Sequence, residues 1–255
     1  MLARPETRES ALLGPLLIVN PKAYLYGPQL LDLAVLVDEV AASSKVTTIF
    51  TAQHADLRLV AERTRHVVVT AQHMDPLRPG RGMGHVLPES LAAAGARAVV
   101  LNHAEHPMSL SDLDVALERS REVGLASIVC ADSDAQCHAV ATLGPDVMIC
   151  EPTAAIGTGA MDEGDYVRRT TAIVKAVDPS ILVIQAAGVT SGADVVRVLA
   201  DGADGSGGTS GILRHPDPRS LLLEMCEALR AHPAAAGRSR TPTPTPTALP
   251  QEPTC

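Results

Sequence analysis

Side chains able to carry out proton transfer follow three separate runs of branched apolar residues. They lie in the segments Asn20-Pro21-Lys22, Asn102-His103-Ala104-Glu105 and Cys150-Glu151-Pro152. A carboxylate can take a proton from carbon, while a histidine and a lysine can stabilise the negative charge left on the substrate. Each residue type alone is more often structural, as a solvated lysine, a hydrogen-bonded histidine or an ion-paired glutamate. The convergence of all three at one site would indicate catalysis.

Small-residue segments that could bind an anion accompany these side chains. The segments are 152–159, Ala187-Gly188-Val189 and Gly208-Thr209-Ser210-Gly211. Backbone N–H groups in glycine-rich turns, particularly before a helix, bind phosphate. One such turn is weak evidence, whereas three beside a lysine, a histidine and a glutamate predict a small phosphorylated substrate. Residues 152–159 could also move as a lid over the site.

Strand ends of a parallel sheet would bring these segments together. Apolar runs alternate with amphipathic stretches along the chain, which is typical of βαβ units. Strands are expected at 16–20, 46–52, 67–72, 98–103, 126–131, 147–152 and 181–188. Helices are expected at 29–43, 56–64, 88–95, 111–124, 134–144, 165–177, 193–202 and 217–232. An eighth strand must lie within 202–211, where no apolar run marks it.

This pattern predicts an α/β protein with a single (β/α)8 barrel domain, a fold of about 250 residues. A doubly wound sheet is the alternative, although it would not require a seventh and an eighth repeat. Polar residues at the carboxyl ends of barrel strands are typical of active sites, and the loops after strands seven and eight often bind phosphate. We expect the barrel at 15–232, a leader at 1–14 and a disordered Thr/Pro-rich tail at 233–255.

Composition excludes several classes of function. The chain of 255 residues has a net charge of −8 and only 2% aromatic residues, which argues against a nucleic-acid partner. No run of about 18 apolar residues indicates a membrane span. Five cysteines without CxxC spacing predict neither a metal site nor a disulfide framework, so we expect a cytoplasmic protein. His54, His73 and His85 are scattered and are interpreted as packing or rim residues.

Taken together, the motifs resemble the triosephosphate isomerase family, specifically its short archaeal-type branch, whose fold is the TIM barrel. The matching segments include Asn20-Pro21-Lys22-Ala23-Tyr24, Ala71-Gln72-His73-Met74-Asp75-Pro76, His85-Val86-Leu87-Pro88-Glu89, Asn102-His103-Ala104-Glu105, and Glu151-Pro152 with Ile156-Gly157-Thr158-Gly159. The resemblance implies interconversion of D-glyceraldehyde 3-phosphate and dihydroxyacetone phosphate through an enediolate, in glycolysis and gluconeogenesis. It also implies no cofactor and a homo-oligomer, either a dimer or a tetramer.

The resemblance assigns a role to each matching residue. Glu151 is implied to be the base, His103 the electrophile and Lys22 the source of positive charge. Asn20 is implied to donate a hydrogen bond. Glu105 is implied to support the catalytic residues without touching the substrate. The implied phosphate-binding residues are Ile156, Gly157, Gly188, Thr209 and Ser210. A neutral imidazole whose pKa is lowered by a helix N-terminus would suit the electrophile, as is known for this family.

Four features depart from the family pattern. The segment between Gly159 and Tyr166 is a few residues shorter, and both ends of the chain are extended. Met83 replaces a threonine in a loop that reaches a neighbouring subunit in family members. Ser206, Gly207 and Gly208 in strand eight replace apolar, mostly branched residues of the family pattern. We therefore expect this strand to be the weakest seam of the barrel, and larger apolar residues at 206–208 to stabilise it.

The altered strand leaves alternative functions open. The glycines could make room for a larger ketose phosphate, such as a tetrulose phosphate, with the same chemistry. A barrel that binds a sugar phosphate without turnover is a third hypothesis. Retention of Glu151, His103 and Lys22 argues against that third hypothesis, because binding alone requires no base.

Overall fold

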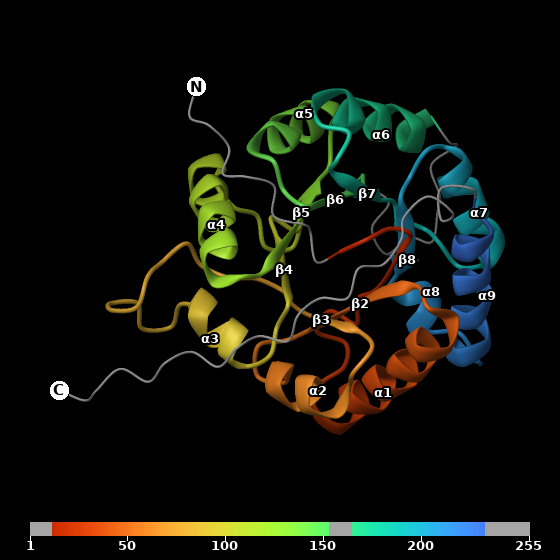
Figure 1. Ribbon diagram of the computed structural model, residues 1–255, viewed down its shortest axis with the longest axis horizontal. Coiled ribbons are helices and arrows are strands. Elements are labelled where there is room, and N and C mark those ends of the chain that lie inside the picture. The colour runs from red at the N-terminus through yellow and green to blue at the C-terminus, as the bar shows by residue number, and fades with distance from the viewer. Residues whose placement is uncertain (1–11, 153–164, 233–255) are drawn as a thin grey trace.

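The computed structural model describes residues 12–152 and 165–232 of the chain. Eight parallel strands close into a barrel in the order β1 to β8, and helices surround it (Figure 1). The strands are β1 (Leu16–Val19), β2 (Thr47–Ala52), β3 (Val68–Ala71), β4 (Ala98–Leu101), β5 (Ala126–Ala131), β6 (Val147–Cys150), β7 (Leu182–Ile184) and β8 (Gly205–Gly208). The helices are α1 (Gly27–Ser44), α2 (Leu57–Arg63), α3 (Pro88–Ala93), α4 (Leu110–Val123), α5 (Asp134–Leu143), α6 (Asp165–Val177), α7 (Gly192–Ala200), α8 (Ser210–Leu213) and α9 (Pro218–Ala231).

Side chains of the strands pack in two layers. Leu16 and Ile18 of β1 belong to the cluster inside the barrel, whereas Leu17 and Val19 belong to the larger cluster between the strands and the helices. Successive side chains of a strand point to opposite faces, and both faces are buried here, so the strands appear in the sequence as continuous apolar runs. Leu12, within the segment expected to be a leader, is buried in the inner cluster.

Local signals in the sequence set the limits of several helices. The hydroxyls of Ser109, Ser133 and Ser191 accept a backbone hydrogen bond in the first turn of α4, α5 and α7. Gly124 and Gly144 adopt the left-handed conformation that ends α4 and α5. The caps end these helices, and because all the strands are parallel, their carboxyl ends lie at one rim of the barrel.

The predicted (β/α)8 barrel is confirmed, and the doubly wound alternative is wrong. Each of the seven expected strands contains the observed one, and β8 lies within 202–211. The eight expected helices are present, but α8 was not predicted, because four residues are too few to show helical periodicity. Residues 1–11 and the expected tail at 233–255 lie outside the described residues. Within the described ranges, no helix is both long and apolar enough to cross a membrane.

The glycines of β8 allow two backbones to approach closely. A Cβ atom at Gly205 would lie 2.5 Å from the Leu16 carbonyl oxygen, and one at Gly207 would lie 1.9 Å from the Ile18 carbonyl oxygen. The expectation that larger residues at 206–208 stabilise the strand is therefore wrong at Gly207. The space next to these two glycines is occupied by β1, so they do not enlarge the interior for a bigger substrate.

The seam between β7 and β8 depends on side chains as well as on the backbone. β8 pairs with β1 at four positions but with β7 only at Ile184 and Gly205. Ser206 Oγ donates to the Gln185 carbonyl oxygen at 3.0 Å, and Asp204 Oδ2 accepts from the Val183 N–H at 2.9 Å. These contacts replace some of the backbone pairing that β7 and β8 lack.

Candidate active site

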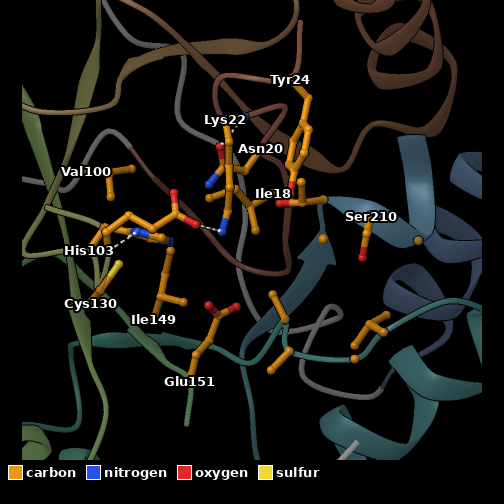
Figure 2. A pocket seen from close by; sticks show the side chains of 18 of the residues that line it. Ile18, Asn20, Lys22, Tyr24, Val100, His103, Cys130, Ile149, Glu151 and Ser210 are labelled. Atoms are coloured by element: carbon orange, nitrogen blue, oxygen red, sulfur yellow. Dashed lines mark hydrogen bonds and ion pairs between the residues drawn. The ribbon is translucent and has the colours of Figure 1, made fainter. Parts of the chain in front are cut away.

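A cavity at the carboxyl rim of the barrel collects most of the described residues that the motifs singled out. Figure 2 shows Asn20, Lys22, His103, Glu151 and Ser210 around it, contributed by the ends of β1, β4, β6 and β8. The apolar floor of the cavity consists of interior residues of the barrel, including Ile18, Val100 and Ile149. The described members of the predicted set therefore meet at one place, as the strand-end argument requires.

Lys22 is held in a constrained loop directly after β1. Its backbone has a φ of 49°, in the left-handed region, and its side chain is 14% exposed. The Nζ atom forms an ion pair with Glu105 Oε1 at 2.8 Å. The hydrogen bond from Lys22 lowers the pKa of the Glu105 carboxyl, which keeps this carboxylate ionised. Glu105 thus holds the lysine from the side, and the charge of Lys22 borders the cavity.

His103 has its ring orientation and tautomer set by the turn that follows it. The Glu105 backbone N–H donates to Nδ1 of His103 at 3.1 Å. An atom that accepts a hydrogen bond carries no proton, so the neutral ring carries its proton on Nε2. Burial lowers the pKa of His103, and the positive charge of Lys22 lowers it further. His103 is therefore a neutral hydrogen-bond donor.

The cause of that lowered pKa differs from the one expected. The resemblance to the family implied a helix N-terminus beside His103, but α4 begins only at Leu110. A single turn follows His103 instead, closed by a hydrogen bond from the His106 N–H to the His103 carbonyl oxygen at 2.8 Å. Burial and Lys22 are the main causes, and the turn supplies the N–H group at Nδ1.

Asn102 anchors the loop that carries His103 and Glu105. Its φ of 56° is left-handed, a conformation that asparagine tolerates better than most residues. Its Nδ2 donates to the Cys130 carbonyl oxygen, and its Oδ1 accepts from the Met108 N–H, both at 3.0 Å. Asn102 was noted as part of a motif, but without this role. The two bonds fix the loop between β4 and α4 against the end of β5.

Glu151 lies at the end of β6, with its backbone N–H bonded to the Ala131 carbonyl oxygen at 3.0 Å. Its side chain lines the cavity that also contains Lys22 and His103. Burial raises the pKa of Glu151, although the charge of Lys22 opposes the shift. A carboxylate with a raised pKa is a stronger base, which suits a group that must remove a proton from carbon.

The opposite side of the cavity carries the predicted phosphate-binding residues. Gly188, with a left-handed φ of 72°, Thr209 and Ser210 all line it. The N–H groups of Ile212 and Leu213 are bonded to the Thr209 carbonyl oxygen, at 3.2 and 2.9 Å. The N–H groups of Ser210 and Gly211 precede these bonds at the start of α8 and have no acceptor within the helix. Ile156 and Gly157 lie outside the described residues.

Two residues next to the site escaped the sequence analysis. Thr51 Oγ1 donates to Asn20 Oδ1 at 2.7 Å, and Gln72 Nε2 donates to the Lys22 carbonyl oxygen at 3.0 Å. Thr51 lies inside an apolar strand, where a single threonine gives no functional signal. Gln72 was noted only as part of a matching segment.

The scattered histidines lie around a neighbouring cavity. His54, His73 and His85 line it, and it shares Lys22 and His103 with the first cavity. His73 is buried, whereas the side chain of His85 is 58% exposed. Over residues 12–152 and 165–232, no group of three His, Cys, Asp or Glu side chains could hold a metal ion.

Comparison with known proteins decides the family. Residues 15–215 match the sequence profile described as Triosephosphate isomerase. The chain belongs to the triosephosphate isomerase family. Among its relatives, the triosephosphate isomerase of Methanopyrus kandleri is 37% identical over 221 residues, which cover 84% of this chain and 98% of the relative. That of Sulfurisphaera tokodaii is 32% identical over 223 residues, covering 85% and 96%.

Membership of the triosephosphate isomerase family confirms the resemblance that the motifs indicated. The relative from Methanocaldococcus jannaschii is 31% identical over 215 residues and is covered over 98% of its length, so the match spans nearly whole proteins. A neutral histidine opposite a glutamate base is the known arrangement in this family. In this chain, His103 accepts a hydrogen bond at Nδ1, and the pKa of the partly buried Glu151 is raised.

Proposed function

We propose that this chain is a triosephosphate isomerase that interconverts D-glyceraldehyde 3-phosphate and dihydroxyacetone phosphate. One observation carries the proposal: Glu151, a neutral His103 and Lys22 border the same cavity as Gly188, Thr209 and Ser210. The first group suits proton transfer beside a carbonyl, and the second suits a phosphate. Family membership supports the same reaction.

Glu151 moves the proton between the two carbons in this proposal. Its carboxylate removes a proton from C1 of dihydroxyacetone phosphate, which gives an enediolate and a protonated Glu151. The same proton then returns at C2, while a proton moves from O1 to O2, so the product is an isomer. No electrons leave the substrate, and the reaction therefore requires no redox cofactor. Burial raises the pKa of Glu151, which strengthens the base.

Three groups stabilise the negative charge that develops on the substrate oxygens. His103 donates from Nε2, Lys22 supplies a fixed positive charge, and Asn20 offers its amide nitrogen. Fixed donors and charges in a buried site stabilise such a charge without reorganisation at the moment of reaction. Glu105 keeps Lys22 in place through their 2.8 Å ion pair.

The phosphate is bound by Gly188, Thr209 and Ser210, together with Ile156 and Gly157. The glycine allows the backbone to approach an anion closely, and Ser210 and Gly211 at the start of α8 line the same cavity. The three described residues support this assignment because they line the cavity opposite His103. Ile156 and Gly157 are assigned on the family motif.

A three-carbon substrate is favoured over a tetrulose phosphate. The argument for a larger substrate was the absence of side chains in β8. At Gly205 and Gly207, however, the backbone of Leu16 and Ile18 fills the space that a side chain would take. A barrel that only binds a sugar phosphate is disfavoured, because it would not need a carboxylate base in the cavity.

We also propose that the enzyme is a homo-oligomer, a dimer or a tetramer, in the cytoplasm. The loop between β3 and α3 protrudes from the barrel (Figure 1), and Met83 within this loop is fully exposed. Asp75 closes the base of this loop: its backbone N–H donates to the Val86 carbonyl oxygen, and its carboxylate accepts from the Val86 N–H. An exposed methionine on a braced loop suits a contact with a second copy of the chain.

The four cysteines within the described ranges carry free thiols, which suits a reducing compartment.

A kinetic comparison tests the substrate assignment. Purified protein is assayed for kcat/KM with dihydroxyacetone phosphate and with a four-carbon ketose phosphate under the same conditions. We expect a clear preference for the three-carbon substrate. A preference for the four-carbon substrate would move the assignment to the alternative isomerase, and binding of both without turnover would indicate a binding barrel. Light scattering on the same sample gives the oligomeric state.

A further inference from the structure

A chain of hydrogen bonds runs from β3 through β2 to the loop after β1. Gln72 Nε2 lies 3.4 Å from Thr51 Oγ1 and 3.0 Å from the Lys22 carbonyl oxygen. Thr51 Oγ1 lies 2.7 Å from Asn20 Oδ1, which is also 3.0 Å from the Lys22 backbone nitrogen. The four residues form one network beside the cavity, and Thr51 is completely buried within it.

The chemistry of the donors fixes the direction of each bond. The Lys22 backbone N–H can only donate, so the Asn20 atom facing it must be the amide oxygen. Gln72 Nε2 can also only donate, so the Thr51 hydroxyl accepts from it. The hydroxyl hydrogen is thereby left for Asn20 Oδ1. Two donors therefore hold one oxygen of Asn20, and the orientation of its amide is determined.

The remaining polar group of Asn20 is its amide nitrogen. Among the residues that the structure describes, no acceptor bonds to Nδ2, and Asn20 lines the cavity with Lys22 and His103. A flipped amide would place its oxygen toward the substrate oxygens and repel a developing negative charge. The orientation of the amide thus decides whether Asn20 stabilises or destabilises the enediolate.

We propose that Thr51 is a positioning residue for the isomerisation, which holds the Asn20 amide with its nitrogen toward the substrate. This inference rests on the proposed function, because it concerns the oxygen atoms of the enediolate. Thr51 itself does not touch the substrate; it acts through Asn20. The hydrogen bond from Gln72 strengthens the contact between Thr51 and Asn20, because a hydroxyl that accepts a hydrogen bond becomes a better donor.

Thr48 provides a matched comparison on the same strand. It is as completely buried as Thr51, but its hydroxyl donates to the Val46 carbonyl oxygen of its own segment at 3.1 Å. The change from threonine to valine keeps the shape at both positions and removes one hydroxyl. The stability effects of the two changes should be similar, whereas only the change at Thr51 should affect the amide of Asn20.

The experiment combines Thr51→Val, Thr51→Ser and Thr48→Val with Asn20→Ala in a double-mutant cycle. For Thr51→Val we expect kcat to fall roughly 3- to 10-fold with little change in KM, as for the loss of one hydrogen bond. Thr51→Ser restores the hydroxyl and should recover activity, and Thr48→Val should keep it. In the Asn20→Ala background, Thr51→Val should change kcat less than twofold, because the amide it orients is absent.

Several results would overturn the inference. A Thr51→Val enzyme with wild-type kcat would exclude the role while leaving the isomerase assignment intact, provided that Asn20→Ala lowers kcat. Equal losses from Thr51→Val with and without Asn20 would show that Thr51 does not act through the amide. A wild-type enzyme without isomerase activity would overturn the proposed function and this inference together. If Thr51→Val does not fold, Thr51→Ala is placed in the same cycle and judged by the same outcomes.

Discussion

Two neighbouring glycines in β8 should respond in opposite ways to the same substitution. In Gly207→Ala, the new Cβ would lie 1.9 Å from the Ile18 carbonyl oxygen and 2.7 Å from its Cγ2 atom. The first neighbour is backbone, so the strands themselves must separate. Overpacking typically costs about 1–3 kcal/mol, and we place this change near the upper value because no side chain can rotate away. Gly207 also has a φ of 158°, a conformation that L side chains rarely adopt, so the usual gain from replacing a strand glycine does not apply here.

The net expectation for Gly207→Ala is a loss of about 3 kcal/mol of unfolding free energy, which corresponds to roughly 6–12 °C in Tm. In Gly208→Ala, the nearest atom to the Cβ is the Val189 carbonyl oxygen at 3.5 Å, an ordinary contact, so the Tm should stay equal or rise. Thermal and urea unfolding followed by circular dichroism would measure both. Equal stability of the two variants would refute the close approach of β1 and β8.

Two further predictions concern the charge states in the active site. In His103→Ala, kcat should fall about 10²- to 10³-fold, the usual effect of losing one donor to a developing oxyanion. Nitrogen NMR of the wild type should show a mostly neutral ring at pH 6.5 with its proton on Nε2. A mostly charged ring at that pH would contradict the lowered pKa, and a neutral ring protonated on Nδ1 would contradict the tautomer. For Glu151, the raised pKa means that the base is lost to protonation earlier as the pH falls. The acid limb of kcat/KM, corrected for ionisation of the substrate phosphate, should therefore lie above pH 4.5, and a limb at or below that value would show that burial does not affect this carboxyl.

Most of the barrel could be predicted because its strands and helices carry strong local signals. Apolar runs marked seven strands, and the amphipathic stretches between them marked the helices. The strand β8 could be placed only by counting repeats, since Gly205 and Gly207 carry no hydrophobic pattern. Their purpose, close approach to β1, depends on a neighbour about 190 positions earlier in the chain, which no local pattern reveals.

The candidate site was predicted in its residues but not in its contacts. Glu151, His103 and Lys22 follow strands, so the fold argument placed them at one rim. The tautomer of His103 depends on a backbone N–H in the following turn, and the orientation of Asn20 depends on Thr51, a buried residue of another strand. Such pairings arise from the three-dimensional register of strands, and a single sequence contains no periodic signal for them.

The role of Glu151 as the base is tested most directly by proton exchange. Dihydroxyacetone phosphate is incubated in deuterated water with the wild type, with Glu151→Gln and with Glu118→Gln, a matched change on the exposed face of α4. Deuterium incorporation at carbon is followed by NMR. We predict rapid incorporation with the wild type and Glu118→Gln, and a rate reduced by about 10²–10⁴-fold or more in Glu151→Gln, since the general base is removed. Incorporation by a folded Glu151→Gln enzyme within tenfold of the wild type would contradict the account.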